Sequence, residues 1–255
     1  MCTWFTDARQ QLEPEIGATW KDFDGTYAIF DGAGSPLTQT FGLGLFGPAT
    51  PALLSEIEAF FAQRGVPVTH EISPLAGVET MATLVDRGYR PIELSTVLVQ
   101  QVDVSTGPPA SPALRVRLVD PQERAAWAET SSAGWSGDPA IAAIIRPIAA
   151  LAGLAGANPT LAHFLAERDG SPIATASLGV HEGVALLAGA STIPAARALG
   201  AQAVLLAARL AEARRRGCEI AMMVAEPDST SQRGAERRGF RVAYTRTKWR
   251  LHRPA

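Results

Sequence analysis

Hydrophobic and polar positions in the second half of the chain change from the period of a strand to the period of a helix. Residues 184–190 form an apolar run of strand length. Residues 200–216 carry apolar side chains at helical spacing, at Ala203, Leu206, Ala207 and Leu210. Gly200 stands where the two patterns meet. This stretch therefore predicts a buried strand, a turn that contains a glycine, and a long helix.

The first half shows the same succession of patterns. Residues 27–30 and 37–46 read as strands, and Thr50-Pro51 is a typical helix start. The apolar side chains of that helix are Leu53, Leu54, Ile57, Phe60 and Phe61. A strand at 66–72, a helix and a strand at 92–102 follow.

Three short signals recur between the halves. Arg64-Gly65, Pro74 and Arg87-Gly88-Tyr89 return as Arg216-Gly217, Pro227 and Arg238-Gly239-Phe240, at offsets of 152, 153 and 151 residues. A repeat of this length indicates a duplicated domain, because solenoids have more and shorter units. We expect a first domain at 1–103, a proline-rich linker at 104–113 and a second domain at 114–255.

The turn before the long helix has the properties of an anion site. Gly200 allows close backbone approach, and Pro194 restricts the chain before it. The amides of Ala201, Gln202 and Ala203 are expected to be unpaired at the helix start, where the helix dipole is positive.

The residues from Ala190 to Gln202 resemble the acyl-CoA loop of the GCN5-related N-acetyltransferase (GNAT) family. The family pattern is Arg or Gln, two residues, Gly, one residue, then Gly or Ala, and here Arg197 and Gly200 match while Gln202 departs. The order of elements from about residue 115 to residue 251 is similar to that of the family. The resemblance implies an α/β (α+β) fold with two tandem acyl-CoA N-acyltransferase (GNAT-like) domains, each a mixed central sheet flanked by helices.

The resemblance also implies a set of site residues. In the family the fourth and fifth strands splay apart around the pantetheine arm, and here these are residues 184–192 and 220–225. Backbone groups of the loop would hold acetyl-CoA, at Ser191, Thr192, Ile193, Arg197, Ala198, Leu199, Gly200, Ala201, Gln202 and Ala203. Ser131 and Trp135 fall in the segment that often lines the acceptor pocket.

The proton carriers are less well marked. Ala235 occupies the position of the usual catalytic tyrosine, so Tyr244 is the candidate acid, with a core tyrosine as the alternative. His163 and His181 lie on or beside strands, and we interpret both as structural. The sequence shows no metal-binding pattern.

The first copy differs where the second has its loop. The segment 47–51 contains Pro48 and Pro51, which lack the amides that a phosphate needs, so we interpret this copy as degenerate. Gly42, Gly44 and Gly47 match a dinucleotide fingerprint by letter, but no acidic residue follows at the required distance. Glycines at a bend in a strand explain them better.

Composition and charge limit the classes of function. The net charge of −2 argues against a general nucleic-acid binder, although residues 209–255 hold 12 Lys or Arg against 5 Asp or Glu. We expect most of these arginines to lie on a solvated face. The absence of a long apolar run and of a signal-peptide pattern predicts a cytoplasmic protein without membrane partners.

The sequence thus predicts an N-acetyltransferase that transfers an acetyl or short acyl group from acetyl-CoA to an amine by direct attack. Its acceptor would be a small-molecule amine or a protein amine, and a homodimer is left open. The alternative is a catalytically inactive CoA-binding or scaffold protein, and a weaker one is an adaptor.

Overall fold

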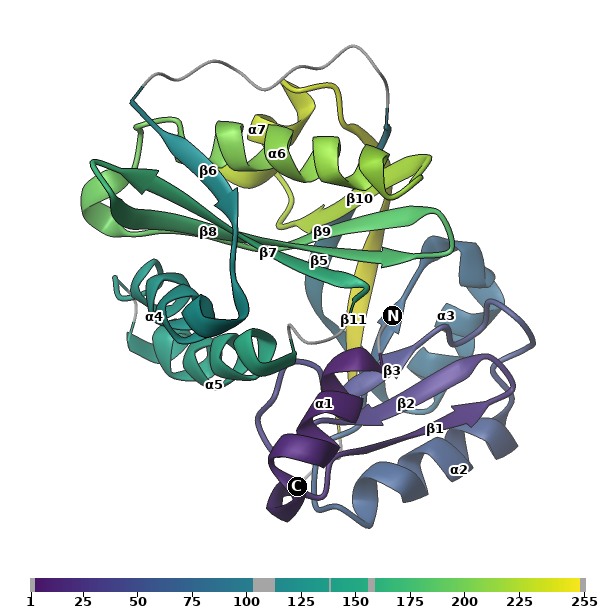
Figure 1. Cartoon of the computed structure of the whole chain (residues 1–255). Helices are drawn as coiled ribbons and strands as arrows, with labels where there is room; N and C mark the ends of the chain where they lie inside the picture. The colour runs from purple at the N-terminus through teal and green to yellow at the C-terminus, as the bar shows by residue number, and fades with distance from the viewer. Residues whose placement is uncertain (1–2, 103–112, 138, 156–158, 253–255) are drawn as a thin grey trace. The chain divides into compact units, whose positions relative to one another are not determined.

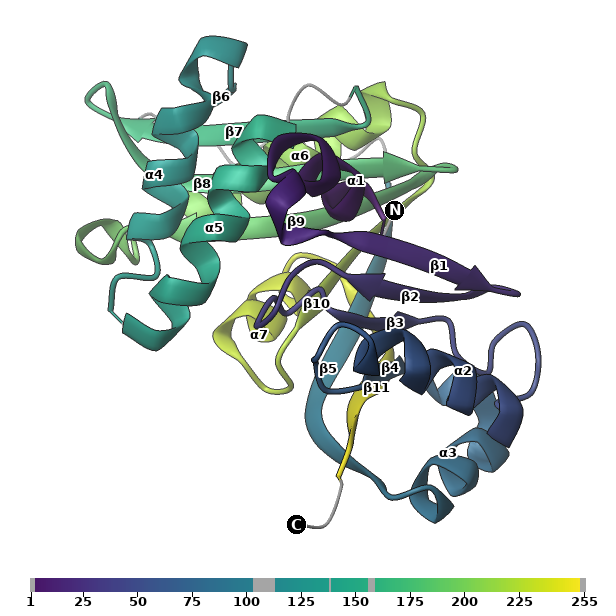
Figure 2. The ribbon, with the colours of Figure 1, turned by 90° about the horizontal axis from the view of Figure 1, so that it is seen from below.

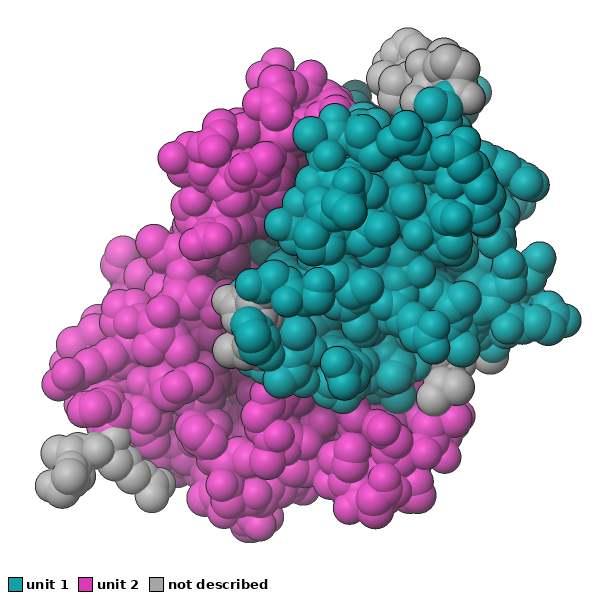
Figure 3. All heavy atoms as spheres, turned by 90° about the vertical axis from the view of Figure 1, so that its left-hand side faces the viewer, with its two compact units in different colours: residues 1, 99–224 teal, residues 2–98, 225–255 magenta. Residues whose placement is uncertain are grey.

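The structure is a computed structural model of the whole chain and describes residues 3–102, 113–137, 139–155 and 159–252. Two compact units divide it: residues 99–224 form unit 1, and residues 2–98 with 225–255 form unit 2 (Figure 3). The expected linker lies, except for its last residue, outside the described residues. The units differ from the expected domains because residues 225–255 cluster with the first half of the chain.

Unit 1 contains a mixed sheet in the order β10-β9-β8-β7-β6. Its strands are β6 (Arg115–Leu118), β7 (Leu161–Arg168), β8 (Ser171–His181), β9 (Val184–Thr192) and β10 (Ile220–Ala225). Neighbours from β6 to β9 are antiparallel, whereas β9 and β10 are parallel. A parallel pair needs a crossover, and α6 (Ala201–Arg215) provides it.

Helices cover both faces of the unit 1 strands. Figure 1 shows α6 on one side, and α4 (Arg124–Ala133) and α5 (Pro139–Ala155) on the other. Two short 3₁₀ helices, η3 (Pro121–Glu123) and η4 (Pro194–Ala196), precede α4 and α6. Asp120 and Glu123 form a capping box that fixes the start of η3. Leu205 from α6 and Trp127 from α4 are buried, so apolar burial holds both layers on the sheet.

Unit 2 repeats this arrangement. Its strands run in the order β1-β2-β3-β4-β11-β5, with bounds β1 (Thr19–Phe23), β2 (Thr26–Phe30), β3 (Gln39–Phe41), β4 (Thr69–Ile72), β5 (Tyr89–Gln101) and β11 (Arg241–Leu251). Its helices are α1 (Trp4–Leu12), η1 (Pro14–Ile16), α2 (Pro51–Ala62), η2 (Pro74–Ala76), α3 (Gly77–Asp86) and α7 (Thr230–Glu236). Antiparallel strands again lead through a helix, α2, to a parallel pair, β3 and β4. The order of elements agrees with a duplicated unit.

The last strand of the chain belongs to unit 2. β11 pairs antiparallel with β4, and Trp249 from β11 is buried in the core of this unit. Arg246 donates to Ser95 at 2.8 Å and forms an ion pair with Glu71 at 2.5 Å. Strand pairing, core packing and side-chain bonds therefore all place residues 241–251 with the first half of the chain.

Two details of unit 2 differ from the sequence expectations. The strand expected at 37–46 ends at Phe41, because Gly42 and Gly44 take positive φ angles of 86° and 80° and turn the chain. β1 was not predicted, and it lies at the edge of the β1-β2-β3 group (Figure 2). Among the described residues, the helices are too short or too polar to cross a membrane.

Candidate functional site

The strands β9 and β10 begin as neighbours and then separate. Parallel pairing joins residues 184–186 to residues 220–222, and in the described part of the chain no pair follows between the remainders of the two strands. Ala188, Gly189 and Ala190 on β9 are exposed. This opening agrees with the splayed strands expected from the sequence. An unpaired strand edge offers backbone donors and acceptors to an extended ligand.

A β-bulge bends β9 within this opening. Thr175 of β8 pairs with Ser191, but Ser177 pairs with Ala188, so β9 holds one extra residue. Gly189 lies in the bulge with φ of 60°, and a Cβ added there would lie 3.0 Å from the Ser177 hydroxyl. The bulge therefore needs glycine at this position.

A buried arginine binds the two carbonyls beside the bulge. Arg209 of α6 is 3% exposed and donates from Nη1 to the carbonyls of Ser177 and Ala188, both at 3.4 Å. Among the described residues it has no carboxylate partner, and burial lowers its pKa to about 10. Arg209 is an exception to the expectation that most arginines from residue 209 onward lie on a solvated face, because its side chain points at the sheet.

The loop after β9, where the sequence predicts an anion site, leads into the start of α6. Gly200 is the N-cap residue in the left-handed conformation, with φ of 83°, and Ala198 also has a positive φ of 65°. Within the described residues, the backbone N–H groups of residues 198–202 make no hydrogen bond. A Cβ added at Gly200 would have no atom within 4 Å, so the space in front of the loop is open. These amides and the positive end of a 15-residue helix can bind a phosphate.

One of the expected amides is not free. The Ala203 N–H donates to the Gly200 carbonyl at 2.9 Å, because the first turn of α6 closes by a three-residue hydrogen bond. The expectation that this amide is unpaired is wrong. The unpaired amides of the loop are those that precede Ala203.

Gln202, which departs from the family pattern, joins the start of α6 to the end of β9. Its Nε2 donates to the Ser191 carbonyl and to the Thr192 hydroxyl, both at 2.9 Å. The Ile193 amide donates to the Ile173 carbonyl at 3.0 Å. The polar groups expected to bind the pantetheine arm at residues 191–193 are thus largely used within the protein. The free edge of β9 lies earlier, at residues 187–190.

The C-terminal turn of α4 packs tightly against the same strand end. The Ser191 hydroxyl donates to the Ser131 carbonyl at 2.7 Å, and a Cβ added at Gly134 would lie 1.7 Å from the Ser191 hydroxyl oxygen. Arg197 donates from Nη2 to the Gly134 carbonyl at 3.0 Å. The structure therefore brings the predicted acceptor segment against the predicted loop. Ser131 is buried, whereas Trp135 is exposed.

A pocket of about 380 Å³ lies between α4 and α5, next to this turn. Neither Ser131 nor Trp135 lines it, but their neighbours Ser132 and Ser136 do. Glu129 and Arg146 add one charge of each sign, and alanines form much of the remaining wall. Sequence reasoning missed this pocket, because small residues on two helices give no chemical signal.

His163 is a structural residue, as interpreted from the sequence. Its Nε2–H donates to the Ala152 carbonyl at 2.9 Å, so Nδ1 accepts from the Ser177 hydroxyl at 2.9 Å. Its ring lies 4.3 Å from that of Trp127, and burial lowers its pKa to about 4. His163 is therefore neutral at pH 7, with both ring nitrogens in use.

Tyr244 lies half-buried on β11 in unit 2, whereas the loop and the open strand edge lie in unit 1. Its role as the acid stays a prediction. Among the described residues, no three His, Cys, Asp or Glu side chains lie close enough together to hold a metal ion.

Unit 2 differs from unit 1 at the parallel strand pair β3 and β4. Leu43, which follows β3, is 1% exposed and belongs to the core of the unit. Thr40 of β3 and His70 of the parallel strand β4 are joined by a buried hydrogen bond of 2.7 Å. The two strands that would separate around a ligand are held together here.

Comparison with known proteins agrees with this geometry. Residues 127–240 match the model of the acetyltransferase (GNAT) family. A GCN5-related N-acetyltransferase from Kribbella flavida has a similar structure, with a TM-score of 0.69 and 20% identity over 98% of this chain and 96% of that one. A tandem GNAT protein from the clavulanic acid biosynthesis pathway gives a TM-score of 0.65 and 15% identity over 90% of this chain and 79% of that one.

A GCN5-related N-acetyltransferase from Sphaerobacter thermophilus gives a TM-score of 0.60 and 18% identity, over 80% of this chain and 68% of that one. Curated proteins give no match. Identities this low show the fold, and together with the match of residues 127–240 they confirm the resemblance and the tandem arrangement inferred from the sequence.

Proposed function

From the premise that the chain has the tandem GNAT fold and that residues 127–240 match that family, we propose that it is an N-acetyltransferase. It would transfer an acetyl or short acyl group from acetyl-CoA to an amine by direct attack, at a site in unit 1. The observation that carries the proposal is the run of unpaired amides at residues 198–202, beside a strand pair that separates.

The protein would hold acetyl-CoA mainly through its backbone. The amides of Gly200, Ala201 and Gln202 would bind the diphosphate, because they are unpaired and lie at the positive end of α6. The free edge of β9 at residues 187–190 would pair with the amide groups of the pantetheine arm, as an added strand does. Such binding would hold the thioester beside the amine nucleophile. Holding two reactants in place lowers the entropic part of the activation barrier.

The amine would approach from the α4 side. Ser131 and Trp135 remain the acceptor residues that we predict, and the pocket between α4 and α5 adds Glu129 as a carboxylate that could attract an ammonium group. β9 itself carries no ionisable side chain from Val184 to Thr192. The amine would therefore lose its proton to water or to a group outside this strand, and Tyr244 is proposed as the acid for the leaving thiolate.

A catalytically inactive CoA-binding or scaffold protein is the second candidate. The observation that favours it is the lack of an ionisable side chain on β9, together with alanine at position 235. Such a protein would still bind the cofactor but would not catalyse acyl transfer to an amine. From the sequence we still expect a cytoplasmic location and no nucleic-acid partners. A homodimer remains an open possibility.

Two measurements on the full chain separate these candidates. Isothermal titration calorimetry with acetyl-CoA tests the site, and no binding at millimolar cofactor would refute both candidates and leave the adaptor. Release of free thiol from acetyl-CoA, followed across a broad amine library, tests the transfer. Binding without thiol release for any amine would favour the inactive protein.

A further inference from the structure

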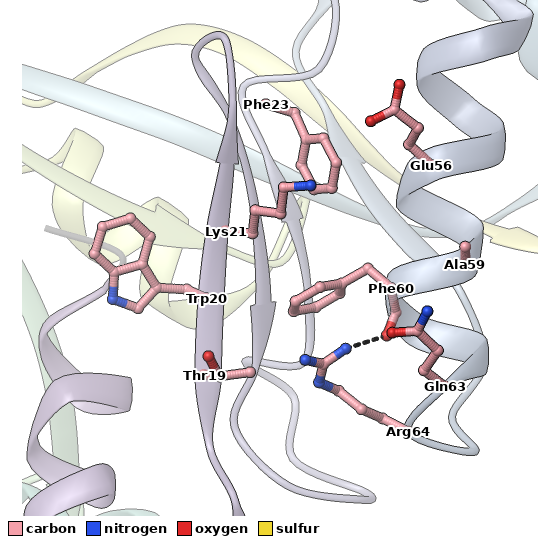
Figure 4. A pocket seen from close by; sticks show the side chains of 9 residues that line it. All are labelled: Thr19, Trp20, Lys21, Phe23, Glu56, Ala59, Phe60, Gln63 and Arg64. Carbon is pink, nitrogen blue, oxygen red and sulfur yellow. Dashed lines mark hydrogen bonds between the residues drawn. The ribbon is translucent and has the colours of Figure 1, made fainter.

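A second pocket, of about 510 Å³, lies within unit 2 between the edge strand β1 and the helix α2 (Figure 4). None of its residues belongs to the proposed acetyl-CoA site. Figure 4 shows that Thr19, Lys21 and Phe23 point from β1 toward the helix. Trp20 points away from the helix, and its indole N–H donates to Asp7 at 2.8 Å. From the edge strand, the pocket is lined mainly by the face that points toward the helix, together with Trp20.

The pocket exists because α2 packs on the inner strands and leaves β1 uncovered. Leu54, Ile57 and Phe61 on α2 are completely buried in the core. Toward β1 the helix presents Ala59, which is too small to fill the space. The volume is within the range of pockets that bind small molecules.

Two cations lie against aromatic rings in this pocket. The Lys21 ammonium is 4.2 Å from the centroid of the Phe23 ring, and the Arg64 guanidinium carbon is 3.8 Å from that of Phe60. Figure 4 shows the Phe60 ring between the two cationic groups. Stacking on a ring occupies the face of a guanidinium and leaves the N–H donors at its edge available.

Neither cation forms an ion pair with a described residue. Within the described residues, no carboxylate lies within 4.0 Å of Lys21 or Arg64. Arg64 uses Nη1 to donate to the Phe60 carbonyl, and its other N–H groups have no hydrogen-bond partner among the described residues. Desolvation lowers the pKa of Arg64, which agrees with a charge that lacks compensation.

The one carboxylate of the pocket is placed away from the Arg64 end. Glu56 lies on α2, about two helical turns before Arg64, which follows the end of the helix. Figure 4 shows Glu56 at the opposite end of the helix segment from Arg64. The end of the pocket near Arg64 contains Gln63, which is a neutral donor and acceptor. An anion at this end would meet only cationic and neutral groups.

We propose that this pocket binds a small organic carboxylate with an aromatic or flat apolar body. The carboxylate would be bound by the free guanidinium edge of Arg64, which matches the two oxygens of a carboxylate, and Lys21 would add a second positive charge. The apolar body would lie against Ala59 and against the part of the Phe60 ring that Arg64 leaves uncovered. This site is independent of acetyl transfer and would give a ligand of its own to the unit that contains the copy interpreted as degenerate.

The test uses the full chain and three probes of one shape: benzoate, phenyl phosphate and benzyl alcohol. Binding is measured by saturation-transfer NMR and by calorimetry. We expect benzoate to bind more tightly than the other two. Equal binding of benzyl alcohol would show that the charge is irrelevant, and tighter binding of phenyl phosphate would assign the site to phosphates; either result, or no binding of benzoate at millimolar concentration, overturns the proposal.

Variants locate the bound carboxylate. We expect Arg64→Gln to weaken benzoate roughly tenfold or more and Lys21→Gln severalfold, whereas Arg90→Gln, an exposed arginine of the same unit, should have no effect. Arg64→Lys keeps the charge without the planar edge and should fall between wild type and Arg64→Gln. Thermal unfolding checks that each variant folds. Unchanged affinity in both Arg64 variants would refute the placement.

Discussion

Replacement of Gly200 by aspartate tests the proposed acetyl-CoA site most directly. The new carboxylate would stand at the N-cap of α6, beside the unpaired amides of residues 198–202. There is room for it, because no atom lies within 4 Å of the added Cβ. The substitution therefore changes the charge of the site without filling the core.

The stability of the protein should change little. The left-handed conformation at position 200, with φ of 83°, is unfavourable for a residue with a Cβ, but aspartate and asparagine tolerate it better than most. Aspartate is also a slightly better N-cap residue than glycine, by about a few tenths of a kcal/mol. The two effects oppose each other, so we expect a change in the free energy of unfolding of less than about 1 kcal/mol.

Cofactor binding should change much more. Two unit charges about 4 Å apart interact by about 1 kcal/mol in water and about 4 kcal/mol at the effective dielectric of a protein surface. Repulsion of the diphosphate within these limits weakens the affinity roughly fivefold to several hundredfold. The aspartate side chain would in addition compete for the amides that the phosphate needs.

Gly200→Asn is the matched control, because asparagine has the same shape and similar backbone preferences without the charge. Calorimetry with acetyl-CoA at low and high salt should show a large loss for Asp, a small loss for Asn, and a difference that shrinks as salt rises. If both variants bind as the wild type does, the diphosphate is not at this loop. If Asn is as weak as Asp, the electrostatic argument is wrong.

Three further predictions follow from other contacts. Gly189→Val should weaken acetyl-CoA binding measured by calorimetry, because its Cβ would meet Ser177 and the bulge would be lost. Gly183→Val in the preceding turn is the control, because position 183 has open space and a similar positive φ, and it should show no comparable loss of affinity. Burial lowers the pKa of His163 to about 4 and that of His70 to about 3, below the value of about 6.5 in the unfolded chain, so the unfolded chain binds more protons in acid. These two groups should leave the free energy of unfolding unchanged above about pH 6.5 and lower it by about 1.4 kcal/mol per pH unit and histidine between about pH 6 and 5. Urea unfolding between pH 7 and 5 measures this dependence, and a flat profile would contradict the assignment. Arg9→Met should destabilise the protein by about 3–5 kcal/mol, because it leaves the buried Asp31 carboxylate without its ion pair, and Arg90→Met should leave the denaturation midpoint unchanged.

Much of the fold could be predicted because it depends on local signals. The repeat of Arg-Gly and Pro positions identified two copies of one unit, and the change of period at Gly200 located β9, the loop and α6. The placement of β11 could not be predicted. An alternating strand shows that one of its faces is buried, but its sequence does not say which neighbour it pairs with.

The candidate site was predictable where it depends on backbone conformation and not where it depends on tertiary contacts. A glycine before a helix predicts free amides, and those at residues 200–202 are free. The isolated Gly189 within an apolar strand was a signal for the bulge. The bonds from Gln202 to the end of β9 join residues about ten positions apart, and no sequence pattern predicts them.

Arg209 lies in an arginine-rich stretch of sequence, yet its side chain contacts the bent part of β9 in the candidate site. It stands in a helix with three further arginines near its end, a pattern typical of a solvated surface. A buried cation without a carboxylate is costly, so its bonds to the carbonyls of Ser177 and Ala188 must be part of what holds it there. These are the carbonyls of the residue pair that borders the bulge. The buried charge therefore stabilises the bent form of β9, and this bend lies where the strand loses its partner β10 and its edge becomes available to a ligand.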